Sequence, residues 1–307
     1  MIDRLRRWIA FLLLTNKSFR FFRWFGVYVA PVHFYSPIPD IRELDQQPKL
    51  WTAASTMPGV KMNPEEHSEF MTKALSQFVG ECEFPTHATT VPHEYFVRNS
   101  YFGYVSASAM HCIVRLYHPR RIVDIGAGFT TRVFAHAVLM NAKLGFPAKL
   151  DAIDPYPSSV LLQGFPGLTT VLAKRAQDLD IDFLTQLDAN DILSIDTSHV
   201  VRTGGDVNYL YLEVLPRLKP GVLVHIHDIF LPFEYPRTWL HRRSFWNEQY
   251  LLQGFLCYNS AFKPLWGQKY AESVLREEYE LLFHGKTDYD DNFDSYSFWM
   301  QRIASLD

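Results

Sequence analysis

The sequence predicts an α/β fold, a doubly wound and mostly parallel sheet preceded by an N-terminal helical extension. From residue 119 onward, short apolar runs alternate with stretches of helical periodicity. This alternation is typical of βαβ units, in which right-handed crossovers join parallel strands. Of the 307 residues, 48% are hydrophobic and 21% are charged, so the chain can bury a substantial core and is not disordered.

Within the α/β core, five strands are expected, at residues 121–126, 148–156, 168–174, 191–199 and 222–230. The intervening stretches with helical periodicity are residues 130–145, 180–190 and 206–221. Residues 278–285 and 295–303 are expected to add a last antiparallel pair. Before the core, helices are expected at residues 63–82, with Asn63 as the N-cap, and at residues 104–118.

The chain is expected to have three segments: a basic and aromatic helical segment at residues 1–30, a connector with a helical cap at residues 31–118, and a core at residues 119–307. The apolar run from Trp8 to Leu14 is far shorter than the ~18–20 residues of a membrane span, and no small-residue cleavage site follows it. Basic and aromatic residues alternate over residues 1–24, which suits peripheral contact with a membrane. Packing on the body or on a second subunit of a homo-oligomer is the alternative.

Charge and cysteine content narrow the class of partner and the compartment. The net charge is −3 and no basic tract runs through the body, which argues against nucleic acid as a partner. The three cysteines are far apart and form no CxxC pair, so neither a disulfide framework nor a zinc cluster is indicated. We therefore expect a cytoplasmic protein, peripheral at the membrane if residues 1–24 contact lipid.

Two glycines and an acid lie where the first expected strand ends. The stretch "DIGAG" contains Asp124, Gly126 and Gly128. Glycines there let the backbone approach a ligand, and the following helix offers free N–H groups. The second strand ends in Asp154, whose carboxylate can accept both hydroxyls of a ribose. Because ligands of doubly wound sheets bind beyond the carboxyl ends of the strands, we interpret these features as a nucleoside site.

The expected nucleoside is S-adenosylmethionine rather than a dinucleotide. A dinucleotide motif needs a third glycine where this chain has Thr131. In addition, the Asp124 carboxylate beside the loop would repel a pyrophosphate, whereas it can assist an amino group or a cationic ligand. Both observations favour the sulfonium cofactor.

Aspartates and histidines follow the fourth and fifth expected strands. Asp196 and His199 come after the fourth, and His227 and Asp228 end the fifth. Such groups can bind a divalent metal ion (Mg²⁺, Mn²⁺ or Fe²⁺), with Asp196, His227 and Asp228 as the expected ligands. Alternatively, a histidine removes the proton from a substrate hydroxyl while an aspartate fixes the histidine tautomer.

These motifs resemble those of class I S-adenosylmethionine-dependent methyltransferases, in particular a bacterial subgroup with DxGxG, DxxH and HD motifs. The similarity includes "DIGAGFTT", "DTSHV", "LPRLKPG" and "HIHD" and covers most of the chain after about residue 27. It implies a Rossmann-like fold and metal or base roles for the strand-end acids and His227. The cofactor-binding residues that it implies are Asp124, Gly126, Gly128, Thr130 and Asp154.

The resemblance also suggests a role for a segment before the core and shows one departure. Residues 93–105 are expected to close over the methionine end of the cofactor through Arg98 and Asn99, with Arg98 meeting its carboxylate. A surface lead-in is the alternative. Catechol-type relatives have an Asp-Asn pair after the fifth strand, where this chain has His227-Asp228, so metal binding stays open.

The predicted function is O-methylation of a small-molecule hydroxyl, with catalytic roles for Asp196, His199, His227 and Asp228. Residues 233–252 are expected to form a substrate lid, since core packing would explain their aromatic residues but not the Glu248-Gln249 pair. Two other classes of function remain open. One is a metal-dependent hydrolase or oxygenase on the same scaffold, and the other is a non-catalytic nucleoside-binding protein.

Overall fold

The computed structural model describes residues 2–283 and 295–304. The chain forms two compact units, Met1–Thr52 with Arg237–Phe245 and Ala53–Pro236 with Trp246–Asp307. This division differs from the three expected segments. The helical cap belongs to the second unit because α5, Tyr104–Tyr117, is buried from Tyr104 to Arg115 in the same apolar cluster as the helix after the first strand.

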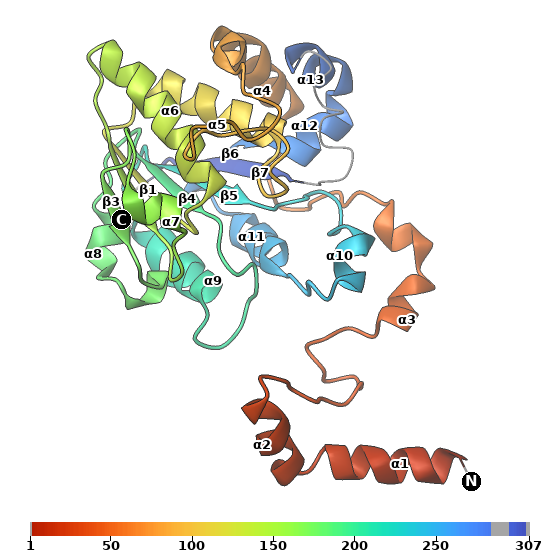
Figure 1. Ribbon diagram of the computed structural model, residues 1–307. Helices are drawn as coiled ribbons and strands as arrows, with labels where there is room; N and C mark the ends of the chain where they lie inside the picture. Colours follow the sequence, from red (N-terminus) through yellow and green to blue (C-terminus); the bar gives the residue numbers. More distant parts are fainter. Residues whose placement is uncertain (1, 284–294, 305–307) are drawn as a thin grey trace. The chain divides into compact units, whose positions relative to one another are not determined.

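Seven strands of the described chain form one sheet in the order β3-β2-β1-β4-β5-β7-β6 (Figure 1). The strands are β1 Arg121–Ile125, β2 Lys149–Ile153, β3 Thr170–Leu172, β4 Ile192–Ile195, β5 Leu223–His227, β6 Phe262–Gly267 and β7 Ser297–Arg302. β1 to β5 are parallel, whereas β7 runs antiparallel to both β5 and β6. The doubly wound, mostly parallel and Rossmann-like fold class expected from the sequence is therefore confirmed.

Helices cover both faces of the sheet. In the second unit they are α4 Pro64–Glu69, α5 Tyr104–Tyr117, α6 Phe129–Lys143, α7 Ser159–Gln163, α8 Ile181–Thr185, α9 Asp206–Tyr209, α11 Glu248–Leu256, α12 Gln268–Val274 and α13 Arg276–Leu282. A π-helical turn, Phe70–Ala74, continues α4, and another, Leu210–Val214, continues α9. Helix α4 begins after Asn63, whose side chain accepts hydrogen bonds from the backbone of Glu65 and Glu66, as the N-cap prediction requires.

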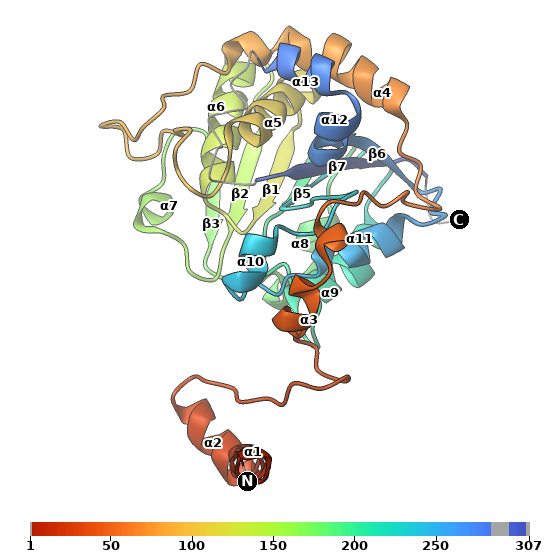
Figure 2. The same cartoon turned by 90° about the vertical axis from the view of Figure 1, so that its right-hand side faces the viewer.

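The alternation of side chains along the strands explains the layers. In β1, Ile122 packs into the cluster formed with α5 and α6, whereas Val123 and Ile125 pack into the cluster that contains residues of α8, α9 and α11. Successive strand residues point to opposite faces, so a strand buried on both faces needs an unbroken apolar run. Figure 2 shows the two helical layers on either side of the sheet.

The C-terminal part of the sheet differs from the prediction. Residues 295–303 were expected to pair with residues 278–285, but the antiparallel partner of β7 is β6, Phe262–Gly267. Residues Arg276–Leu282 form α13, because Tyr279 and Leu282 are spaced for one helical face and are buried, whereas Leu281 between them is 77% exposed. Residues 284 and 285 lie outside the described residues.

The first unit contains α1 Ile2–Leu13, α2 Asn16–Trp24, α3 Ile41–Asp45 and α10 Arg237–His241. The Thr15 side chain caps α2 by accepting a hydrogen bond from Ser18 N. Asp45 pairs with Arg237 and His241 and so connects the two chain segments of this unit. Across the described residues, no helix has both the length and the apolar character that crossing a bilayer demands.

Candidate active site

The ends of β1 and β4 meet where the strand order reverses, the usual position of ligand sites in such sheets. Gly126 follows β1 with φ of +84°, and a Cβ on it would lie 1.4 Å from the carbonyl oxygen of Asp196. The Asp196 N–H donates to Ile125 O at 2.8 Å. Only glycine allows the two strand ends to lie this close, since any side chain would collide with the Asp196 backbone.

The Asp124 side chain stabilises the glycine loop through hydrogen bonds to two threonines of the following helix. Its Oδ2 accepts hydrogen bonds from the hydroxyls of Thr130 at 2.9 Å and Thr131 at 2.6 Å. The Thr131 hydroxyl in turn accepts a hydrogen bond from Gly128 N. Asp124 is fully buried, and burial raises its pKa to about 6 despite these hydrogen bonds. The second oxygen, Oδ1, has no hydrogen-bond partner among the described residues.

A cavity of about 490 Å³ opens beyond the carboxyl ends of β1 to β4. Its walls include three residues predicted from the sequence: Gly126, Asp154 and Asp196. A volume of this size is in the ordinary range for small-molecule sites. The two features that suggested a nucleoside site therefore lie at one cavity, because β1 and β2 are adjacent and parallel.

Asp154 lies at the β2 side of this cavity. Its Oδ1 accepts a hydrogen bond from Tyr156 N at 2.6 Å, which orients the carboxylate. Burial raises the pKa of Asp154, and the nearby Asp196 adds to the rise. Gly128 is not needed for packing, because a Cβ placed on it would have no neighbour within 4 Å. The space above the loop at Gly128 is thus open to a ligand.

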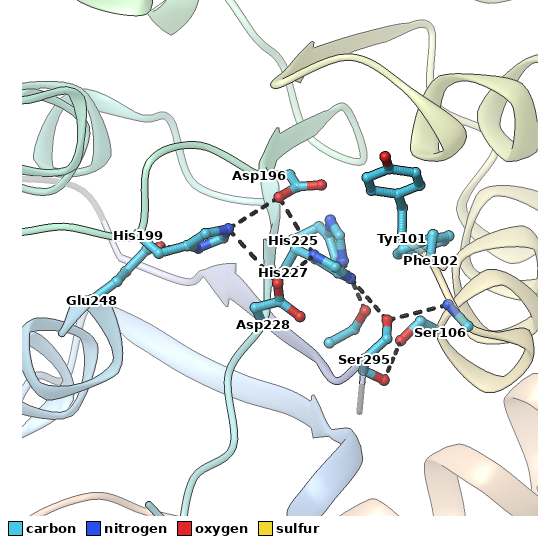
Figure 3. Close-up of polar contacts among 12 residues, drawn as sticks. Tyr101, Phe102, Ser106, Asp196, His199, His225, His227, Asp228, Glu248 and Ser295 are labelled. Carbon is cyan, nitrogen blue, oxygen red and sulfur yellow. Dashed lines mark hydrogen bonds and ion pairs between the residues drawn. The ribbon is translucent and has the colours of Figure 1, made fainter. Parts of the chain in front are cut away.

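Four predicted residues converge beside the cavity (Figure 3). Asp196 Oδ1 lies 3.2 Å from His199 Nε2 and 3.4 Å from His227 Nδ1. Asp228 Oδ2 lies 3.4 Å from His227 Nδ1 and 3.8 Å from His199 Nε2. We call these four residues the strand-end cluster. They meet because β4 and β5 are adjacent and parallel, so both strands end at the same edge of the sheet.

Two further side chains orient the imidazoles. Glu248 Oε2 lies 2.8 Å from His199 Nδ1, and Ser295 Oγ lies 2.9 Å from His227 Nε2. The contacts with Glu248 and Ser295 thus occupy the outer ring nitrogens, Nδ1 of His199 and Nε2 of His227. The inner nitrogens, Nε2 of His199 and Nδ1 of His227, face Asp196 and Asp228. Partners on the outer nitrogen fix the tautomer and the ring orientation, as they do for histidines that bind metal ions.

The charges of the cluster are strongly coupled. Burial alone would lower the pKa of His227, but the charges of Asp228 and Asp196 raise it to about 10. Burial also opposes protonation of His199, yet its interactions with Asp196 and Glu248 raise its pKa well above the ordinary value. For Asp196, burial would raise the pKa, but the two imidazoles outweigh it and hold the pKa below its usual range. The imidazoles therefore carry protons at neutral pH.

The backbone of the cluster is strained. His199 has a φ of +56° and Asp228 has a φ of +55°. Residues other than glycine rarely adopt this left-handed backbone conformation. Such positions cost about 1–3 kcal/mol each and are concentrated at functional sites. The loop at His199 is held by its carbonyl oxygen, which accepts hydrogen bonds from the backbone of Asn247 and Glu248.

His225 lies on the same face of β5 as His227 but belongs to the core. Its Nδ1 lies 3.0 Å from Ser194 Oγ and its Nε2 lies 3.0 Å from Ser297 Oγ. Burial lowers its pKa to about 3, so the ring is neutral. Both nitrogens are engaged, and this histidine is a structural residue between three strands.

The segment predicted to close over the cofactor, residues 93–105, contacts the strand-end cluster through Phe102 rather than through Arg98 or Asn99. Arg98 is exposed, and Asn99 uses its amide within the loop, donating to Phe96 O and Phe102 O and accepting from the backbone of Tyr101 and Phe102. Neither residue is among the described residues that line the cavity. The loop places Phe102 instead, whose ring centroid lies 5.1 Å from that of His227.

The predicted lid segment divides between the two units, with residues 237–245 in the first. In the second unit, Glu248 and Gln249 are buried as the sequence suggested. Gln249 accepts a hydrogen bond from Phe230 N and donates to Phe233 O, which fixes the chain after β5. The Trp246 ring lies 4.3 Å from that of His199 between centroids. This segment thus supports His199 directly.

Several residues of the site were not identified from the sequence. The stretch Lys174–Gln177 follows β3 and lines the cavity, and the rule applied to the other strand ends would have found it. Tyr156, Ser198 and Asp206 also line the cavity. Ser295 carries no local signal, because only the antiparallel insertion of β7 beside β5 brings it to His227.

A family model described as "Methyltransferase domain" matches residues 123–229. The matched range contains the Gly126 turn, Asp154 and the whole strand-end cluster. An uncharacterized protein of Archaeoglobus fulgidus is 29% identical over 174 residues, which represent 54% of this chain and 77% of that protein. The family match supports a methyltransferase domain in this part of the chain.

Two solved structures resemble the chain at low identity. The O-methyltransferase TomG of Streptomyces achromogenes, involved in tomaymycin synthesis and solved with S-adenosylmethionine, is 16% identical; the alignment covers 80% of this chain and 92% of TomG, with a TM-score of 0.38. A DUF574 family protein of Streptomyces avermitilis is 13% identical, with coverage of 64% and 80% and a TM-score of 0.34.

Proposed function

We propose that this chain is an S-adenosylmethionine-dependent methyltransferase that methylates a hydroxyl oxygen of a small molecule. The family match over residues 123–229 supports the enzyme class. The observation that carries the proposal is the position of Asp196, which lines the cavity and also belongs to the strand-end cluster. A cofactor in the cavity and an acceptor at the cluster would thus be neighbours, as methyl transfer requires.

The residues present fit the proposed cofactor. Gly126 and Gly128 have no side chains, so the backbone of the loop is accessible at both positions, and the cavity extends from Gly126 to Asp154. We assign to Asp154 the hydroxyls of the ribose, and to Asp124 and Thr130 the support of the loop. Arg98 and Asn99 remain candidates for the amino-acid end through the loop that they form. When bound, S-adenosylmethionine supplies an activated methyl group on its sulfonium.

A divalent metal ion also fits the strand-end cluster. His227 Nδ1 and Asp228 Oδ1 are buried and have no hydrogen-bond partner within the described residues. Ligand atoms of Asp196, His199 and His227 lie within 4.8 Å of one another. We propose these three as ligands together with Asp228, a set whose imidazoles favour Mn²⁺ or Fe²⁺ over Mg²⁺. When bound, such an ion lowers the pKa of an oxygen ligand.

Protonation decides what the histidines can do. Because the pKa values of His199 and His227 are raised, both imidazoles are donors at neutral pH. In that state they can orient an acceptor oxygen but cannot remove its proton. Removal requires a neutral imidazole, which positive charge added among the carboxylates would favour. We therefore propose that, in the metal-free cluster, His227 or His199 acts as the base once the excess negative charge of the cluster is neutralised. With a metal ion bound, both imidazoles would be ligands rather than bases, and the ion itself would lower the pKa of the acceptor hydroxyl.

Binding and turnover test the proposal separately. Calorimetry with S-adenosylmethionine should show binding that Asp154→Ala weakens by about tenfold or more, since a bond to a ribose hydroxyl is lost. Asp188→Ala is the matched control, because Asp188 is exposed and pairs with Lys219 away from the cavity. Labelled cofactor with a panel of hydroxylated acceptors then measures transfer. Equal affinity for both variants would contradict the role of Asp154.

A metal-dependent hydrolase or oxygenase is the second candidate, favoured by two imidazoles and two carboxylates that meet at one point. It predicts bound metal and ester hydrolysis or oxygen consumption without S-adenosylmethionine. Metal analysis of the purified protein and assays before and after chelation distinguish the two. Cofactor binding with no turnover of any acceptor would indicate a non-catalytic nucleoside-binding protein instead.

We further propose a small molecule rather than nucleic acid as the acceptor and a reducing cytoplasm as the location. The chain is slightly acidic, with a net charge of −3. All three cysteines are free thiols, and Cys82 and Cys112 are buried. A free thiol content of three in protein isolated under non-reducing conditions would support the proposed compartment.

A further inference from the structure

Exposed apolar side chains are concentrated at one end of the chain. We call residues 2–38 the N-terminal arm; it contains α1 and α2 (Figure 2). Thirty large apolar side chains are exposed in the part of the chain that the structure describes, and seventeen of them belong to the arm. Among these, Trp8 is 60% exposed and Trp24 is 80% exposed. No residue of α2 is buried, so the arm places little of its apolar surface in a core.

The arm and the rest of the chain differ sharply in charge. The arm has six basic residues and one acid, Asp3, a formal charge of +5. Since the whole chain has −3, residues 39–307 carry −8. A basic segment on an acidic protein indicates a partner with a negatively charged surface.

The helices of the arm separate these two kinds of side chain. In α1, Leu5, Trp8, Ile9 and Leu12 have the spacing of one apolar stripe, three and four residues apart. In α2, Lys17, Arg20 and Arg23 recur every third residue, and Phe19 and Phe22 do the same on another side. Each helix can therefore lie flat on a boundary between an apolar and a polar phase.

We propose that the N-terminal arm binds the surface of an anionic lipid bilayer, with α1 and α2 parallel to it. Tryptophan and tyrosine side chains prefer the bilayer interface between headgroups and acyl chains. The arm has four such exposed side chains, Trp8, Trp24, Tyr28 and Tyr35. Lysine and arginine supply the attraction to anionic headgroups. A second copy of the chain offers acidic surface on residues 39–307, but most of its exposed apolar side chains belong to its own arm, whose charge of +5 would repel another arm. The inference is independent of the proposed enzymatic activity.

Vesicle binding by the full-length protein tests the proposal. We expect sedimentation with vesicles of phosphatidylcholine containing about one-third phosphatidylglycerol, weak sedimentation with phosphatidylcholine alone, and release by salt. The variant Lys17→Glu/Arg20→Glu/Arg23→Glu should bind on the order of 100-fold less, because each basic residue near the surface contributes about fivefold. Tryptophan fluorescence should shift to the blue on binding, and Trp8→Ser/Trp24→Ser should reduce both the shift and the affinity.

Controls separate a membrane from the other occupants. Tyr258→Ser removes an aromatic ring that is 90% exposed outside the arm and should leave vesicle binding unchanged. Equal binding of the charge-reversed variant, equal binding to neutral vesicles, or no vesicle binding would each overturn the proposal. A dimer by light scattering that the charge reversal dissociates, without vesicle binding, would assign the arm to a second copy of the chain.

Discussion

Replacing Asp124 with asparagine is predicted to change how the stability of the protein depends on pH. The carboxyl group is fully buried, and burial raises its pKa from 3.8 to about 6 in the folded state. The hydroxyls of Thr130 and Thr131 donate to one oxygen only. The folded protein therefore holds a proton at Asp124 more tightly than the unfolded chain does. Asparagine has nearly the same shape and cannot ionise.

The size of the effect follows from the two pKa values. A rise from 3.8 to about 6 corresponds to about 3 kcal/mol between the protonation states. For an acid with a raised pKa, the stabilising preference for the proton is complete below 3.8 and is lost as the pH rises through about 6. The free energy of unfolding of the natural protein should therefore fall, relative to Asp124→Asn, by about 3 kcal/mol between about pH 4 and pH 7.5.

Urea denaturation of the cofactor-free protein and the variant across this pH range provides the measurement. The amide places an N–H₂ group where the carboxylate oxygen has no partner, which shifts the variant's stability by a constant. Only the change with pH matters, because that constant cancels. Parallel stability curves for the two proteins would refute the reasoning and show that Asp124 is solvated or paired. In that case, ionising the Asp124 carboxyl group would not destabilise the folded protein.

The same substitution should have the opposite effect on function. We expect Asp124→Asn to weaken binding of S-adenosylmethionine by about tenfold, because the charge beside the glycine loop is lost. Binding of S-adenosylhomocysteine, which lacks the sulfonium charge, should weaken less. A buried acid that lowers stability and raises cofactor affinity would explain its position in this loop. Equal losses for both ligands would indicate a purely structural role.

Two other predictions concern the loop and the cluster. Gly126→Ala should lower the free energy of unfolding by more than about 3 kcal/mol, since its Cβ would lie 1.4 Å from a backbone oxygen, whereas Gly128→Ala should fold normally and lose cofactor affinity. Similar thermal stability of the two variants would contradict this steric argument. If the neutral imidazole of His199 is the base, as proposed, the transfer rate should rise at alkaline pH. Glu248→Gln removes a negative charge beside His199, so it should lower the pKa of the imidazole and move this rise to lower pH. NMR titration of His199 checks the shift directly, and an unchanged pKa would show that Asp196 and Asp228 alone set it.

The sequence alone predicted the parallel core because its signals are local. The strands β1, β2, β4 and β5 are buried on both faces over most of their length, so each appears as a largely apolar run bounded by polar residues, whereas β3 is only partly buried. The glycine loop could also be recognised from the sequence, because the turn after β1 requires a glycine at position 126. β3 is only three residues long, yet the alternation with helices was enough to place it.

The C-terminal strands show where such signals end. Residues 278–285 and 295–303 have similar apolar content, but the first forms α13 up to Leu282 and only the second forms a strand. Whether such a segment forms a helix or a strand depends on which of its side chains the neighbouring elements of the fold bury. The true partner of β7, Phe262–Gly267, contains Pro264 and has no alternating pattern, so pairing along the sheet edge rather than propensity decides it.

The site divides in the same way. That Asp196, His199, His227 and Asp228 belong together could be inferred from strand ends, because parallel neighbours deliver their carboxyl ends to one edge. Which partners complete the cluster was decided by the tertiary structure. His199 and Glu248 are 49 residues apart, and His227 and Ser295 are 68 residues apart, with no shared element. The backbone of each strand determines where a side chain begins, but packing among distant segments determines its partners, its burial and therefore its charge.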